Sequence, residues 1–219
     1  MALARAVEKI PDVPGKKKRG LLIALEGPTA CNIGDTFEKI RKEFADNLVE
    51  VTLNVQHNWD IPEEEFRRAI AELAAIQPEI IESLDAGKLV VVHNHMMSVL
   101  AAAWRHNVFK CQEMQDVAGA RALFSQCRDI IIPDITFLCM PAVETLVTRL
   151  VKNGNLASDD DYMYSSYREE AQAFGYIHRF MDDAYDIFCD PLGMENQMLN
   201  RIVLSTVTNC FHKKKFYCP

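Results

Sequence analysis

The chain has 219 residues, of which 49% are hydrophobic and 25% are charged, close to the average for soluble globular proteins. This composition excludes disordered and collagen-like classes, and the length suits one domain with a sizeable core. The 24 Lys and Arg residues against 31 Asp and Glu residues give a formal net charge of −7. A surface of this sign repels nucleic acid and anionic membranes, so we expect no nucleic-acid partner.

Cysteine usage and hydropathy indicate where the protein works. The chain contains no C-x-x-C pair, and its cysteines are odd in number and widely spread: 31, 111, 127, 139, 189, 210 and 218. This pattern favours a reducing compartment, so we expect an intracellular protein, mitochondrial or cytoplasmic. The longest uncharged run, 89–104, is interrupted by polar residues, which argues against a membrane span. Glu8 and Asp12 make the N-terminus a poor signal or transit peptide. Earlier removal of a presequence stays an open alternative.

The two ends of the chain differ from the region between them. Residues 1–19 are expected to form a polar leader that ends in the basic run Lys16–Arg19, either a solvated tether or a contact with an acidic partner. The regular pattern covers 20–209. The tail, 210–219, mixes cations with aromatic residues and is either a partner-binding extension or a frayed end.

Between the ends, short apolar runs alternate with helical patterns. Strands are expected near 21–26, 49–55, 89–93, 135–139 and 186–189. Helices are expected over 34–47, 62–86, 98–128, 141–152, 161–185 and 193–209. We expect the second helix to be interrupted at Pro78 and to close at Gly87. The alternation predicts an α/β fold in which a five-stranded parallel sheet lies between helices.

In a parallel sheet the ligand site lies beyond the carboxyl ends of the strands, so the residues that follow each strand were compared first. Four stretches in the right order and spacing resemble thymidylate kinases and related deoxynucleoside kinases: 25–36, 84–98, 133–150 and 188–190. The resemblance covers about 20–209. It implies a three-layer P-loop kinase fold with a phosphate-binding loop after the first strand and a lid near 152–165.

The phosphate-binding loop implied by the resemblance is degenerate. A working loop reads G-x-x-x-x-G-K-[ST], in which Lys neutralises the phosphates and the hydroxyl holds Mg²⁺. Counted from the first glycine, the positions of the second glycine, the lysine and the hydroxyl residue hold Asn, Ile and Gly. Shifting the alignment by one residue brings an Asp-Thr pair nearer to the phosphate site. The vestigial loop therefore consists of Gly27, Asn32, Ile33, Gly34, Asp35 and Thr36.

Other positions that the resemblance assigns to phosphate handling are also altered. The family's Asp-Arg-Tyr reads His93, Asn94 and His95, which removes a carboxylate near the metal and a phosphate-binding arginine. The arginine that contacts the acceptor phosphate falls on Glu72, whereas the serine that follows the motif is kept as Ser98. The lid has one lysine and three acids where the family supplies arginines.

These changes predict a thymidylate-kinase-like protein that has lost phosphoryl transfer and serves as a structural or regulatory subunit, with other protein subunits or a second copy as partner. No cofactor and no metal are then expected. The alternative is an active nucleoside monophosphate kinase of the dTMP type, which uses ATP and Mg²⁺ through a reorganised loop.

Three features keep further hypotheses open. His93 and His95 are expected on one side of an extended chain, as two ligands of a metal ion would be, and His57 or Cys31 could be further ligands. The alternative is that the two histidines fill the site that the acceptor nucleotide occupies in the family. Cys31 near a helix N-terminus is either a catalytic thiol or a passive loop residue. The aromatic residues of 162–185 are core, a binding face, or both.

Overall fold

The structure is a computed structural model of the whole chain. The residues that it describes are 18–28, 31, 33–55, 59–108, 125–152, 161–181, 187–189, 196–213 and 216–217.

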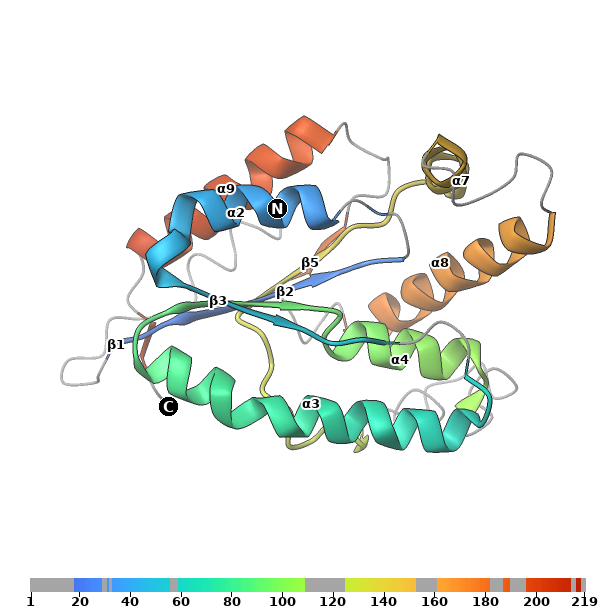
Figure 1. The fold of residues 1–219 in the computed structure, drawn as a ribbon, viewed down its shortest axis with the longest axis horizontal. Helices are drawn as coiled ribbons and strands as arrows, with labels where there is room; N and C mark the ends of the chain where they lie inside the picture. The colour runs from blue at the N-terminus through green and yellow to red at the C-terminus, as the bar shows by residue number, and fades with distance from the viewer. Residues whose placement is uncertain are drawn as a thin grey trace.

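The centre of the fold is a parallel β-sheet (Figure 1). Its strands are β2 (Leu21–Glu26), β3 (Leu48–Thr52), β4 (Leu89–His93), β5 (Ile135–Leu138) and β6 (Ile187–Cys189). They are arranged in the order β3-β4-β2-β5-β6, and each neighbouring pair is parallel. Four strands form the body of the sheet, and the three-residue β6 pairs with β5 at one edge. The predicted parallel α/β architecture is therefore confirmed.

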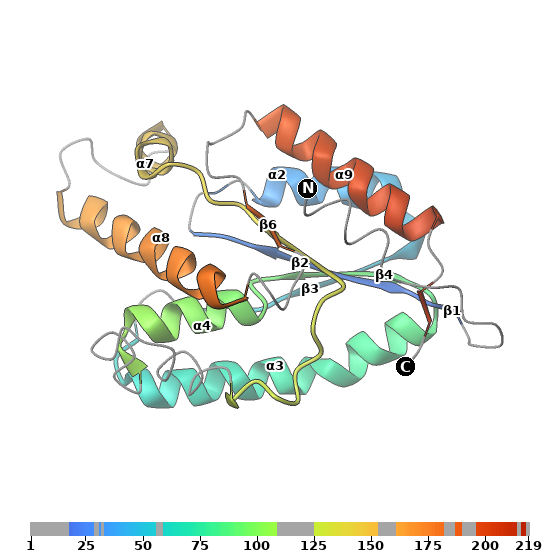
Figure 2. The ribbon, with the colours of Figure 1, turned by 180° about the vertical axis from the view of Figure 1, so that it is seen from behind.

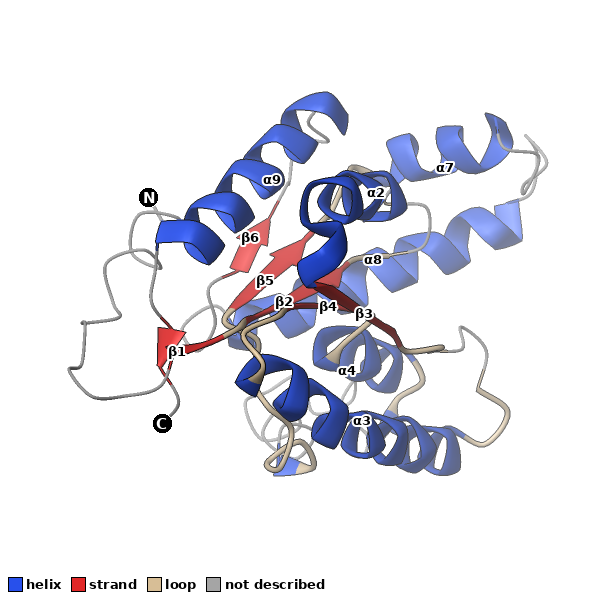
Figure 3. Ribbon diagram, turned by 60° about the vertical axis from the view of Figure 1, so that its left-hand side comes forward, coloured by secondary structure: helices blue, strands red, loops and turns tan. Residues whose placement is uncertain are grey.

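Helices cover both faces of the sheet, which gives three layers (Figure 3). The elements are α2 (Ile33–Phe44), the short 3₁₀ helix η1 (Ala45–Asn47), α3 (Pro62–Asp85), α4 (Met96–Arg105), α7 (Val143–Lys152), α8 (Asp161–Met181) and α9 (Asn196–Lys213). Helices α2 and α9 lie on one face, and α3, α4 and α8 lie on the other (Figures 1 and 3). No helix within the described ranges is long and apolar enough to cross a membrane.

The central strands β2 and β4 are apolar up to their last residues, Glu26 and His93, because both of their faces are covered. Leu21, Ile23 and Leu25 of β2 belong to the core cluster beneath α2 and α9, whereas Leu22 belongs to a cluster with Ile80 and Leu84 of α3. Alternate residues of β4 divide in the same way. Two-sided burial of alternating side chains explains why these strands appear in the sequence as continuous apolar runs.

Helix α3 corrects one prediction, because it continues through Pro78 without interruption. Proline has no N–H for the carbonyl four residues before it, here that of Ala74. Ala74 and Pro78 are both exposed, so water is available to this carbonyl. On the buried side of the same turn, Gln77 Nε2 donates to Leu73 O at 2.7 Å, and Gln77 Oε1 accepts a hydrogen bond from Ile131 N at 2.9 Å.

The two ends of the chain meet, although sequence analysis treated them separately. Strand β1 (Lys18–Arg19) pairs antiparallel with β7 (Phe216–Tyr217), outside the main sheet (Figure 2). Helix α9 runs to Lys213, so the expected helix end at 209 and tail boundary at 210 are both too early. The pairing places Lys18 and Arg19 of the leader beside Tyr217 and Phe216 of the tail.

Asp134, which belongs to one of the family-like stretches, has a structural role. It forms an ion pair with Arg19, and Leu22 N donates to its Oδ2 at 2.8 Å. These contacts lie at the amino end of the sheet, away from the ends of the strands where ligands bind in this fold class. Burial raises the pKa of Asp134 above its ordinary value, and the neighbouring Arg19 opposes that rise.

Candidate functional site

The candidate site is the carboxyl edge of the sheet, where β2, β4 and β5 end side by side. The register pairs Leu25 of β2 with His93 of β4, and Glu26 with Leu138 of β5. Because all three strands are parallel, the residues that follow them converge at one edge. The structure therefore brings Glu26, Gly27, His93 and Cys139 together.

Glu26, the last residue of β2, is fully buried and joins this strand to helix α4. Its carboxylate accepts hydrogen bonds from the backbone N–H groups of Met97 and Ser98, both at 3.1 Å, and a short one from the Ser98 hydroxyl. The first turn of α4 contains no acidic residue of its own. Glu26 therefore supplies the negative charge that the N-terminal end of a helix favours.

The protonation of Glu26 is finely balanced. Burial away from water raises the pKa of this carboxyl from 4.5 to about 7, and the hydrogen bonds from Ser98 and Met97 oppose the rise. At neutral pH both the ionised and the protonated forms are populated. The same contacts occupy Ser98, whose side chain is buried and donates to Glu26.

The two histidines of the degenerate motif are held in their neutral form. His95, which precedes the first turn of α4, is 1% exposed, and burial lowers the pKa of its imidazole to about 4. Burial also lowers the pKa of His93, although the nearby Glu50 works against that shift. The Nε2 atoms of both rings lack a hydrogen-bond partner among the described residues. Neither imidazole therefore places a positive charge at this edge at pH 7.

Asn94 adopts a backbone conformation that few residues tolerate. Its φ of 57° lies in the left-handed region, which asparagine occupies more readily than most residues. Its backbone N donates to Leu25 O and its side-chain Nδ2 donates to Leu53 O, both at 3.2 Å. Asn94 thereby connects the ends of β2, β3 and β4, and this role was not visible in the sequence.

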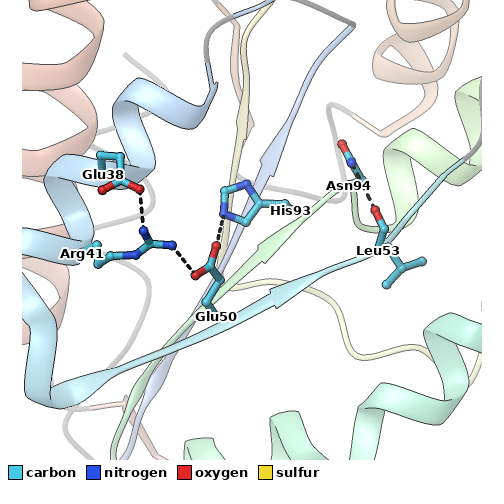
Figure 4. Close-up of polar contacts among 6 residues, drawn as sticks. All are labelled: Glu38, Arg41, Glu50, Leu53, His93 and Asn94. Atoms are coloured by element: carbon cyan, nitrogen blue, oxygen red, sulfur yellow. Dashed lines mark hydrogen bonds and ion pairs between the residues drawn. The ribbon is translucent and has the colours of Figure 1, made fainter.

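A chain of polar side-chain contacts connects α2, β3 and β4 (Figure 4). Arg41 of α2 donates to Glu38 at 2.5 Å and to Glu50 of β3 at 2.6 Å. Glu50 Oε1 lies 3.7 Å from His93 Nε2, and the His93 ring meets the Phe37 ring edge-on. Sequence analysis missed this network. Only the spacing of Glu38 and Arg41, three apart on one helix, signals part of it.

The loop after β2 starts at Gly27. Gly27 has a φ of 156°, and a Cβ atom at this position would lie 2.5 Å from Cys139 O and 2.7 Å from Cys31 Sγ. Gly27 is therefore required by close packing. Helix α2 begins at Ile33, so Ile33, Gly34, Asp35 and Thr36 form its first turn, although their side chains lie outside the described part. Asn32 also lies outside it.

The remaining predicted site residues lie elsewhere. Glu72 is half-exposed on α3, and its Oε1 lies 3.8 Å from the Arg68 guanidinium on the same helix. Of the predicted lid, Lys152 ends α7 and 161–165 begin α8, while 153–160 fall outside the described residues. In the second half of α8, Phe174 is core, and the ring of Tyr176 stacks on Trp104 of α4. His57 lies outside the described part, within which no three His, Cys, Asp or Glu residues form a group that could hold a metal ion.

Comparison with solved structures shows the fold. The chain superposes on a thymidylate kinase from Candida albicans with a TM-score of 0.69 and 14% sequence identity, over 92% of this chain and 98% of that one. No protein-family model matches the sequence, and no curated protein matches it either. The chain thus has the thymidylate kinase (P-loop kinase) fold that the resemblance implied.

The buried pair Glu26 and His95 predicts opposite pH effects on stability. The folded pKa of Glu26 is above its unfolded value, so this residue adds stability as the pH falls from about 7 toward 4.5. The folded pKa of His95 is below its unfolded value, so this residue removes stability as the pH falls from 6.5 toward about 4. In the unaltered chain the two effects oppose one another.

Replacing one group at a time separates them. Between pH 7 and pH 5, Glu26→Gln is expected to lose about 2 kcal/mol more unfolding free energy than the unaltered chain, because the effect of His95 is then unopposed. His95→Phe, the matched control, is expected to gain stability over the same range. Urea unfolding at both pH values measures these differences, and identical pH dependence in all three proteins would contradict the assignment.

Proposed function

We propose that this chain is a thymidylate-kinase-like protein that no longer transfers phosphoryl groups and acts through contacts with other proteins, as a structural or regulatory subunit. The observation that carries the proposal is the absence of a cation at the described carboxyl edge. Phosphoryl transfer depends almost wholly on positioning and on neutralising the charge of the phosphates. A site whose imidazoles are neutral lacks that capacity.

The charged groups near the edge support this proposal because each already has hydrogen-bond or ion-pair partners within the protein. The guanidinium of Arg41 donates to Glu38 and Glu50, and these ion pairs are half-exposed and weak. The buried carboxylate of Glu26 accepts hydrogen bonds from Met97 and Ser98. Glu26 cannot turn to a ligand without leaving these donors unsatisfied, which is unfavourable by about 1–3 kcal/mol.

The described residues do not fit a magnesium–nucleotide complex. Mg²⁺ prefers oxygen ligands, usually one or two carboxylates together with water and phosphate. The resemblance assigns the metal-side carboxylate to position 93, which holds a histidine of lowered pKa. Loss of a single stabilising donor reduces such a reaction by roughly 10²–10³-fold, and several positions have changed together.

The alternative, an active nucleoside monophosphate kinase, is favoured by one feature. Helix α2 begins at Ile33, directly after the loop that follows β2. The backbone N–H groups of a helix N-terminus attract phosphate without any side chain. A kinase that relied on these groups alone would need no lysine at position 33.

A coupled assay with ATP, Mg²⁺ and a panel of nucleoside monophosphates separates the two functions. We expect turnover far below one per second, because the lost charges are not replaced at this edge. Ile33→Lys is expected to restore no activity, since His93 and Glu72 remain, and circular dichroism checks that this variant is folded. Turnover near one per second in the unaltered chain would contradict the loss of transfer.

The protein-contact role makes a separate prediction about the ends of the chain. Deleting 1–17 and 214–219 leaves the ion pair of Arg19 with Asp134 and the contact of Phe211 with Phe44 in place. We expect light scattering to show an assembly of the full chain, with itself or with a co-purifying subunit, that the shortened chain no longer forms. A full chain that is a stable monomer and recovers no subunit at fixed stoichiometry would refute this role.

A further inference from the structure

Two cysteines far apart in the sequence meet at the carboxyl edge of the sheet. Cys31 lies in the loop after β2, and Cys139 directly follows β5. Cys139 Sγ lies 3.1 Å from the backbone oxygen of Cys31, across a separation of 108 residues. Both are buried, with 5% and 6% of their surface exposed.

The packing around Gly27 brings the two residues together from both sides. The position that a Cβ of Gly27 would occupy is 2.7 Å from Cys31 Sγ and 2.5 Å from Cys139 O. Each cysteine therefore contacts Gly27, and the sulfur of Cys139 contacts the backbone of Cys31. Disulfide-bonded cysteines usually have Cα atoms about 4.4–6.8 Å apart. The 3.1 Å contact of Cys139 Sγ with Cys31 O brings the two backbones near this range.

The backbone holds this arrangement in place. The Cys31 N–H donates to Pro28 O at 3.1 Å, which closes the turn that carries Cys31. The Cys139 N–H donates to Glu26 O at 2.9 Å, which extends the pairing of β5 with β2. Backbone hydrogen bonds thus hold Cys31 to Pro28 and Cys139 to the end of β2.

We propose that Cys31 and Cys139 are a modification site that closes to a reversible disulfide when it meets a low-molecular-weight disulfide such as glutathione disulfide. The Cys31 thiolate attacks one sulfur of glutathione disulfide, and the other leaves as glutathione thiolate. The Cys139 thiolate then attacks Cys31 Sγ in the mixed disulfide and releases the second glutathione. Two protein thiols are oxidised, one glutathione disulfide is reduced to two glutathiones, and the two thiol protons pass to the leaving thiolates.

The bond would fasten the loop after β2 to the end of β5. Gly27 and Cys31 could then no longer move away from Cys139. Because both thiols are buried, we expect the oxidant to reach them slowly. The inference concerns the thiols alone and holds whether or not the chain transfers phosphate.

Disulfide mapping of the full chain tests the proposal directly. After incubation with glutathione disulfide and blocking of remaining thiols, trypsin releases the peptides 20–39 and 129–149, each of which contains a single cysteine. We expect these two peptides to be linked, and the link to disappear on reduction with dithiothreitol. The melting temperature of the oxidised chain should rise, since the bond closes a long loop.

Serine variants separate this pair from the other cysteines. Cys31→Ser and Cys139→Ser should each abolish the linked peptide, and Cys139→Ser should leave Cys31 as the mixed disulfide with glutathione. Cys127→Ser, the matched control, removes a buried thiol from a different core cluster and should leave the link intact. Absence of the 20–39 to 129–149 link in the oxidised unaltered chain, or its loss in Cys127→Ser, would overturn the proposal.

Discussion

The carboxylate of Glu26 connects the central strand of the sheet to the start of α4, and the form of the whole edge depends on that contact. It accepts hydrogen bonds from the N–H groups of Met97 and Ser98 and from the Ser98 hydroxyl. Because α4 has no acid in its own first turn, Glu26 is the charge that faces the helix N-terminus. The contact fixes α4 against the sheet and aligns the turn between them, which carries Asn94 and His95.

The same contact explains the electrostatics of this edge. Packing α4 tightly onto β2 excludes water, and this desolvation raises the pKa of Glu26 and lowers that of His95. His93 lies in a similar environment and forms part of the chain that begins at Arg41. The result is an edge that is dry around Glu26 and His95 and half-exposed at the ion pairs of Arg41, in a fold shared with a thymidylate kinase.

The sequence predicted the strands best where consecutive residues are all buried. The run Leu89–Val92 predicts a strand because both of its faces are covered, and the strand at 21–26 was placed correctly for the same reason. Pro78 misled the prediction of α3, since a proline on an exposed helix face leaves its unpaired carbonyl to water. The rule that proline ends a helix does not take into account whether that face of the helix is exposed to water.

Contacts between distant segments were the part that sequence reasoning missed. Sequence analysis named Ser98 and included Glu26 only within the stretch 25–36, and nothing in a single sequence indicates that residues 72 positions apart share a hydrogen bond. The pairing of β1 with β7 involves two residues on each side, too few for a periodic signal. The left-handed backbone of Asn94 and the charge chain at Arg41 depend on the assembled sheet in the same way.

Nucleotide binding measured by isothermal titration calorimetry tests the central claim most directly, namely that this edge no longer holds phosphate. Titrating the full chain with ATP and Mg²⁺, and separately with dTMP, should show millimolar affinity or no heat of binding, because helix N–H groups are what the described part of this edge offers to the anion. A micromolar dissociation constant for either nucleotide would contradict the account. Such a value would mean that cations outside the described edge still neutralise the phosphates.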